Sequence, residues 1–302
     1  MNARFSIVGF LLGVMLVPLA AQTASAPPDP DLSLSDSALA YRDTAYGWKN
    51  SAIGNLNLSQ SHFDNWTKGG TDALSWELRL EGRALKKEET TEWESKGKAV
   101  YGESRVEGLG TRKASDELTL ETIYTYLWTE WVNPFASARF QSQFTAGFEY
   151  NDSLGTRDRV SGPFDPAYLT QTLGVGRAWT DAYKVRVGGT LKETFSSAAY
   201  GYADDDETVG TIETFKLEPG ASFVAEVRQP LMENILLTSV LDIFANFKGT
   251  KETDVRWENQ ITAKVNRWVS ANAALDVLYD HDVSTRRQIR QSLSVGISFL
   301  TL

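Results

Sequence analysis

Apolar and polar residues alternate with a period of two along most of the chain, and this pattern limits the folds available to it. Between Phe135 and Tyr150, every second residue from Ala136 onward is apolar except Ser142, and the residues between them are mostly polar. Successive side chains point to opposite faces of a β-strand, whereas a helix would repeat its apolar residues every three or four positions. The pattern therefore predicts strands that are apolar on one face and polar on the other.

The number of such segments is even, as a closed antiparallel membrane barrel with both ends on one side requires. We predict an all-β fold: a closed antiparallel transmembrane β-barrel of about twelve strands in up-and-down meander order. A soluble β-sandwich or lipocalin-like barrel is the alternative, but twelve strands around one apolar core would leave a wide, empty interior. The predicted strands are 46–60, 72–87, 90–106, 116–132, 135–150, 167–180, 182–195, 211–228, 233–247, 252–266, 268–281 and 286–302.

Short and long connections alternate between the predicted strands, which is typical of periplasmic turns and outer loops. Tryptophan prefers the interface between lipid and water, so tryptophans gathered at one end indicate an aromatic girdle. The short turns are 132–134, 180–182 and 266–268, and the longer loops are 61–71, 107–115, 151–166, 196–210, 248–251 and 282–285. The tryptophans at the short-turn end are Trp48, Trp93, Trp128, Trp131, Trp179 and Trp268.

The N-terminal residues have the pattern of a secretory signal peptide. Arg4 precedes an uncharged apolar run from Phe5 to Ala21, which small residues follow. We expect a signal peptide over residues 1–25, a disordered periplasmic tail over 26–45 and an outer-membrane barrel over 46–302. An uncleaved membrane anchor is the alternative. The predicted location is the outer membrane of a Gram-negative bacterium.

Composition excludes several classes of protein. The chain has no cysteine, so it carries neither disulfides nor the lipid-modified cysteine of a lipoprotein. Its formal net charge of −9 disfavours nucleic-acid binding, which needs clustered Lys and Arg. The partners we expect are outer-membrane lipid and lipopolysaccharide, and the barrel-insertion machinery during assembly.

If the apolar face meets lipid, the polar face lines the lumen. Charges of both signs lie on it in near balance, and two interpretations stay open: the charges cross-link a nearly closed lumen, or they line a narrow polar channel. The lumen-lining candidates are Glu77, Arg79, Glu81, Arg83, Glu94, Lys96, Lys98, Arg139, Lys184, Arg186, Lys192, Lys216, Glu218, Arg256 and Glu258. The same face also carries Glu121, Glu149, Glu226, Asp242, Lys264, Asp276 and Arg290.

Catalytic and metal sites find little support in the sequence. The two histidines, His62 and His281, fall in the first and last outer loops, where closure of the barrel could bring them together as a surface metal site. They lack short ligand spacing, however, and no His-x-Ser arrangement beside an Asn indicates a membrane phospholipase. We expect a non-enzymatic protein with no metal and no cofactor.

The segment Trp48–Trp76 resembles the opening of an outer-membrane β-barrel family catalogued as domain of unknown function 3078. The matching residues of this first-loop motif are Trp48, Asn57, Gln60, Asn65, Trp66, Gly69 and Gly70. The resemblance implies an outer-membrane barrel with no assigned activity.

The function that we predict is a narrow channel or transport-related pore for small polar solutes. The alternative is a structural or surface-binding barrel with a plugged lumen, which acts through its extracellular loops. Eight-stranded barrels are filled and sixteen-stranded ones are open, so a strand number of about twelve leaves both possibilities.

Overall fold

The computed structural model describes residues 46–62, 71–180, 182–204, 210–248, 253–266, 268–279 and 286–301. The predicted signal peptide, residues 1–25, and the predicted tail, residues 26–45, lie outside the described residues. Within the described residues no helix has the length and the apolar character to cross a membrane.

Fourteen strands form in the described part of the chain. They are β1 (Gly47–Ser61), β2 (Ala73–Lys87), β3 (Thr91–Val106), β4 (Gly110–Tyr126), β5 (Asn133–Ser142), β6 (Gly147–Asn151), β7 (Thr156–Ser161), β8 (Ala167–Thr180), β9 (Tyr183–Phe195), β10 (Phe215–Met232), β11 (Ile235–Asn246), β12 (Thr253–Lys264), β13 (Val269–Tyr279) and β14 (Gln288–Thr301).

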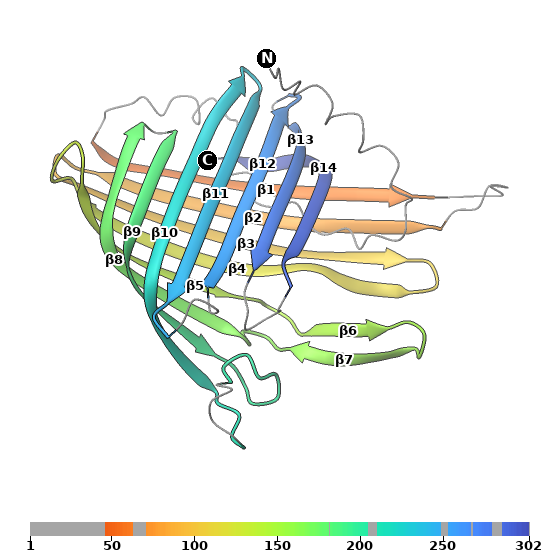
Figure 1. Cartoon of the computed structure of the whole chain (residues 1–302). Helices are drawn as coiled ribbons and strands as arrows, with labels where there is room; N and C mark the ends of the chain where they lie inside the picture. Colours follow the sequence, from red (N-terminus) through yellow and green to blue (C-terminus); the bar gives the residue numbers. More distant parts are fainter. Residues whose placement is uncertain are drawn as a thin grey trace, which may run out of the picture.

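Twelve of these strands close into an antiparallel barrel in the order β1-β14-β13-β12-β11-β10-β9-β8-β5-β4-β3-β2 (Figure 1). Each barrel strand pairs with its sequence neighbours, except that β5 pairs directly with β8. The two strands between them, β6 and β7, form a separate hairpin, which we call the β6–β7 hairpin. The predicted fold class, a closed up-and-down barrel of twelve strands, is confirmed.

The barrel closes where β1 meets β14. This junction has five residue pairs, from Ile53↔Thr301 to Asn57↔Gly296, with a bulge between Gly54 and Asn55. On its other side β1 pairs with β2 along its whole length. A Cβ on Gly296 would lie 2.7 Å from Oδ1 of Asn57, so glycine lets the two strands approach.

Side chains on the two faces of the wall differ in polarity, and the outer face is the apolar one. Leu173 is 71 % and Leu293 84 % exposed, and leucines, valines and aromatic residues continue this apolar surface over the other strands. The inward face holds the buried charged and polar side chains, such as Arg79 and Glu218, each 2 % exposed. This is the reverse of a soluble protein's core and matches the lipid-facing and lumen-facing alternation of a membrane barrel.

One predicted strand, 135–150, is wrong beyond residue 142, because β5 ends at Ser142 and the chain turns away into the β6–β7 hairpin. The amide of Gln143 donates to the carbonyls of Gly162 (3.0 Å) and Asp165 (2.9 Å) at the base of the hairpin. Glu149, which we expected on the lumen face, is exposed on β6. In the antiparallel register of the hairpin it lies opposite Asp158 of β7.

The predicted loop 107–115 and the predicted strand 116–132 are also wrong in their bounds. The connection from β3 to β4 is only 107–109, and β4 runs from Gly110 to Tyr126. Gly108 and Gly110 have φ values of +80° and +75°, which glycine adopts without strain, so the chain reverses within a tight turn. The segment after β4 is an irregular connection, in which Asn133 Oδ1 accepts from the backbone N of Trp128 at 3.0 Å.

The two ends of the barrel differ in their connections. The short connections 88–90, 127–132, 181–182, 233–234 and 265–268 share one end, where β1 begins and β14 finishes. The β6–β7 hairpin and the longer connections lie at the other end, which we call the long-loop end, although the turn 107–109 at this end is as short as 88–90 (Figure 1). The six tryptophans predicted to form the girdle are between 46 % and 67 % exposed at the short-turn end.

Candidate functional site in the barrel lumen

The lumen divides into two parts, a cavity toward the short-turn end and a packed region toward the long-loop end. Nine of the lumen-lining candidates surround the cavity: Glu81, Arg83, Glu94, Lys96, Lys98, Arg139, Lys184, Arg256 and Glu258. Arg186 lines a second cavity of about 40 Å³ beside Arg139. The remaining candidates, Glu77, Arg79, Lys192, Lys216 and Glu218, take part in ion pairs toward the long-loop end.

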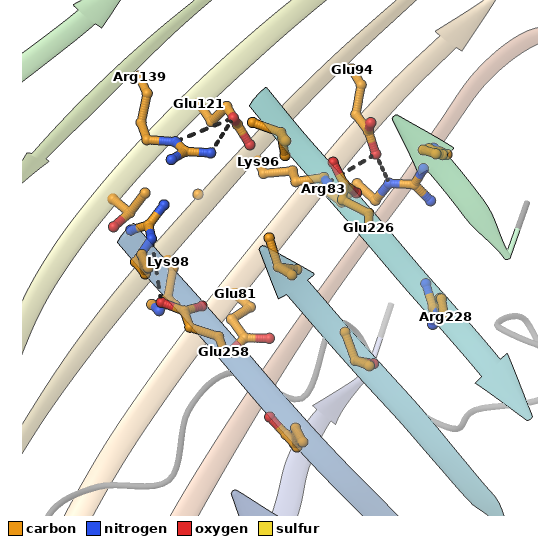
Figure 2. A pocket seen from close by; sticks show the side chains of 18 of the residues that line it. Glu81, Arg83, Glu94, Lys96, Lys98, Glu121, Arg139, Glu226, Arg228 and Glu258 are labelled. Carbon is orange, nitrogen blue, oxygen red and sulfur yellow. Dashed lines mark hydrogen bonds and ion pairs between the residues drawn. The ribbon is translucent and has the colours of Figure 1, made fainter. Parts of the chain in front are cut away.

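The larger space, which we call the lumen cavity, has a volume of about 220 Å³ and reaches Ala182 in the short turn between β8 and β9. Six carboxylates and seven cationic side chains line it, and Figure 2 shows ten of the thirteen labelled. Because the two signs are almost equal, its electrostatic preference for cations or anions is small.

A chain of ion pairs crosses the lumen. Arg139 on β5 donates from Nη2 to Oε1 of Glu121 at 2.8 Å, as Figure 2 shows, and from Nη1 to Oδ2 of Asp242 at 2.8 Å. Asp242 lies on β11, and the strands β8, β9 and β10 separate it from β5 around the wall. Asp242 also accepts from Nη2 of Arg256 at 3.1 Å. The chain therefore joins two distant parts of the wall and narrows the lumen between them.

Other charges around the lumen cavity pair along the wall. Arg83 Nε lies 2.6 Å from Glu94 Oε1, between β2 and β3. Lys98 Nζ lies 2.8 Å from Glu117 Oε1. Arg186 on β9 forms an ion pair with Glu226 on the neighbouring strand β10. Paired charges on neighbouring strands hold each other in place, so the cavity is lined by ordered groups.

Buried charges and hydrogen bonds pack the lumen toward the long-loop end. Arg79 lies between Glu77 and Glu81 on β2, with N···O distances of 3.4 and 3.3 Å, and all three side chains are at most 5 % exposed. Glu77 also accepts from Ser115 Oγ at 2.8 Å and from Asn57 Nδ2 at 3.3 Å. This part of the lumen is filled by side chains.

A second ion pair across the lumen strengthens this packing. Nζ of Lys192 on β9 lies 2.6 Å from Oδ2 of Asp254 on β12, and the strands β10 and β11 lie between β9 and β12 in the wall. Asp254, Glu117 and Arg228 also face the lumen, and the sequence prediction does not include them. The alternation along β4 and β12 would have pointed Glu117 and Asp254 inward, but the predicted bounds put both at strand edges.

The first-loop motif lies only partly within the described residues. Asn57 is buried in the lumen beside Glu77, whereas Gln60 is exposed near the end of β1. Asn65, Trp66, Gly69 and Gly70 lie outside the described residues. The part of the motif that the structure describes therefore contributes one side chain, that of Asn57, to the packed region of the lumen.

Of the two histidines considered as a surface metal site, the structure describes only His62. His62 Nδ1 lies 2.7 Å from Asp72 Oδ2 in an exposed hydrogen bond, and His281 lies outside the described residues. In the part of the chain that the structure describes, no three His, Asp or Glu side chains are grouped so that they could hold a metal ion.

Several solved structures resemble the barrel. The translocator domain of the autotransporter NalP from Neisseria meningitidis is 10 % identical, over 88 % of this chain and 93 % of that chain, with a TM-score of 0.39. The COG4313 outer membrane channel from Pseudomonas putida F1 is 11 % identical, over 85 % and 97 %, with a TM-score of 0.40. A KdgM porin in complex with disordered oligogalacturonate is 9 % identical, over 82 % and 99 %, with a TM-score of 0.33.

Sequence comparison supports the family resemblance without adding an activity. No curated protein matches the chain. The family model described as "Protein of unknown function (DUF3078)" matches residues 58–148, which run from the end of β1 into β6. The resemblance to this family is thereby confirmed over that part of the chain.

Proposed function

We propose that the protein is an outer-membrane channel for small polar solutes, narrowed by the ion pairs that cross its lumen. The observation that carries this proposal is the lumen cavity, which reaches the short-turn end and is bounded by the link from Arg139 to Asp242. An apolar outer wall around a polar interior is the arrangement that a membrane-spanning channel requires.

The chemistry of the lumen cavity supports a small, polar solute. Groups of both signs, among them Lys184, Glu226 and Arg228, line a volume of about 220 Å³. A zwitterionic or hydroxyl-rich molecule could exchange hydrogen bonds with both kinds of group. A molecule with a large net charge of either sign would meet nearly equal numbers of repelling and attracting groups.

Single-channel conductance of the refolded protein in a planar bilayer tests this function. We expect small, reproducible current steps with weak ion selectivity, because the lumen is narrow and nearly neutral. Folding is checked independently by the heat-dependent shift of a closed barrel on a gel. A folded protein that gives no steps in the bilayer would contradict the channel.

A barrel with a permanently plugged lumen is the second candidate function, and the packed region toward the long-loop end favours it. Arg79 and Glu218 are almost inaccessible there, and ion pairs with their neighbours hold them in place. Such a protein would act through its outer loops and the β6–β7 hairpin. The silent but folded barrel described above is the result that this candidate predicts.

A further inference from the structure

One guanidinium on the outer face of the barrel lies between two indole rings. The Cζ atom of Arg177, on β8, is 3.9 Å from the ring centroid of Trp131 and 4.7 Å from that of Trp179. Both rings are more than half exposed and belong to the girdle at the short-turn end. Stacking on two aromatic faces fixes the plane of the guanidinium.

The register places Arg177 on the outer face of the wall. It lies opposite Val185 in the pairing of β8 with β9. The exposed Leu173 and Val175 are on the same face of β8, whereas Thr172, directly before Leu173, is buried and contacts Thr190 in the lumen. Arg177 therefore faces the surroundings of the barrel and not its interior.

No acidic group in the described part of the chain neutralises this charge. Among the described residues Arg177 forms no ion pair, and its Nε is buried without a hydrogen-bond partner. An unpaired arginine on the lipid face of a barrel is unfavourable at the bilayer midplane and tolerated near the headgroups. The flanking tryptophans mark this headgroup level, because indole prefers the interface.

We propose that Arg177, Trp131 and Trp179 form a binding site for the phosphodiester of a glycerophospholipid in the leaflet on the short-turn side. The guanidinium forms charge-assisted hydrogen bonds to the phosphate oxygens, for which its fork of N–H donors is suited. The indole rings hold the guanidinium and contact the glycerol and upper acyl carbons. The site rests on the membrane location included in the proposed function.

Native mass spectrometry of the folded full chain in detergent, titrated with phosphatidylglycerol, tests the site. We expect one lipid to bind more tightly than the rest, and Arg177→Gln to weaken it about tenfold, since a charge-assisted contact is lost. Arg177→Lys keeps the charge but loses the planar stacking, so an intermediate affinity is expected. Inorganic phosphate at millimolar concentration should not displace the lipid, because it lacks the glycerol and acyl contacts.

Arg157→Gln is the matched control. Arg157 also stacks on an aromatic ring, that of Phe148 at 4.5 Å, but it lies on the β6–β7 hairpin at the long-loop end. Unchanged lipid affinity in Arg177→Gln, or an equal loss in Arg157→Gln, would overturn the site. Insertion of the same protein into phosphatidylglycerol vesicles, followed by flotation, distinguishes the failures: an inserted barrel without the tight lipid contradicts only this site, and a barrel that does not insert contradicts the membrane location as well.

Discussion

Arg139 and Asp242 join two parts of the barrel wall that are far apart around its circumference, with Nη1 and Oδ2 at 2.8 Å. Arg139 also donates a hydrogen bond to Glu121, and Asp242 also accepts one from Arg256. The pair is therefore the middle of a connected chain of ion pairs across the lumen. Its removal should therefore change the width of the lumen more than the loss of a pair along the wall would.

Asp242→Asn is expected to increase the single-channel conductance and to shift selectivity toward anions, since one carboxylate leaves a nearly neutral lumen. Arg139 keeps its bond to Glu121, so we expect folding to survive with a loss of about 1–3 kcal/mol in the free energy of unfolding. Conductance and reversal potential in a salt gradient measure both changes. Glu117→Gln, which removes the wall pair with Lys98, is the control and should change the selectivity without widening the lumen.

The buried group of Glu77, Arg79 and Glu81 predicts a large effect on stability. Arg79→Met leaves two carboxylates, each at most 5 % exposed, without the cation between them. Breaking a buried ion pair in this way destabilises by about 3–5 kcal/mol.

Urea unfolding, followed by the gel shift, measures this loss, and the exposed pair of Lys86 and Glu88 supplies the comparison. Lys86 Nζ lies 2.6 Å from Glu88 Oε1, and the side chains are 37 % and 52 % exposed, so Lys86→Met should change the free energy of unfolding far less than Arg79→Met does. Equal effects of the two substitutions would show that burial does not control the strength of these pairs.

A close approach of two strands makes a further prediction at Gly174. A Cβ there would meet the backbone oxygen of Val187 at 2.1 Å, so β8 or β9 would have to move. We expect Gly174→Ala to destabilise the barrel by about 1–3 kcal/mol through overpacking. Gly189, on β9, has open space at its Cβ position, and Gly189→Ala should leave the unfolding midpoint within error of the wild type.

The alternation of the sequence predicted the barrel and the inward direction of side chains such as Glu81 and Lys98, but not the position of Glu149, which lies on the β6–β7 hairpin. Residues such as Glu81 and Lys98 face inward because a strand has a period of two, which depends on local sequence only. The pairing of Arg139 with Asp242 could not be predicted, since contacts across a barrel depend on its tilt and shear, which follow from the register of every strand.

The departure of the chain after Ser142 was missed for a related reason. Apolar and polar residues keep alternating from Gln143 to Tyr150, so the pattern of period two predicts a strand that continues past Ser142. The turn is fixed by Asp116 on β4, whose carboxylate accepts from the backbone N of Phe144 (2.7 Å) and of Thr145 (2.8 Å). A contact between residues so far apart in sequence has no signature in a pattern of period two.

Asp116→Ala should accordingly loosen the β6–β7 hairpin while the barrel stays closed. Two backbone donors and the hydroxyl of Thr145, which donates at 2.6 Å, lose their acceptor. Local opening then becomes easier, and trypsin should cleave after Arg157 or Arg159 about tenfold faster. Glu149→Ala, an exposed change on the same hairpin, should leave the rate of cleavage as it is; acceleration by both variants would contradict a specific role for Asp116.

The tip of the hairpin provides a prediction for pH. Its turn carries Asp152, and the hydrogen bond from Arg112 lowers the pKa of that carboxyl below its ordinary value. Because the folded pKa lies below the unfolded value of about 3.9, the pair favours the folded hairpin at neutral pH, and its contribution is lost as the pH falls through the folded pKa.

An NMR titration of the Asp152 carboxyl carbon in detergent micelles measures this pKa directly. We expect a midpoint below that of a model peptide, and a return to the ordinary range in Arg112→Gln, since the donor that favours the ionised form is gone. Arg157→Gln removes a charge from the same hairpin without removing the bond to Asp152, so the midpoint should stay low. If the wild type and Arg112→Gln titrate at the same pH, the pair does not hold the hairpin in solution, and the order of the hairpin depends on Asp116 and Gln143 at its base.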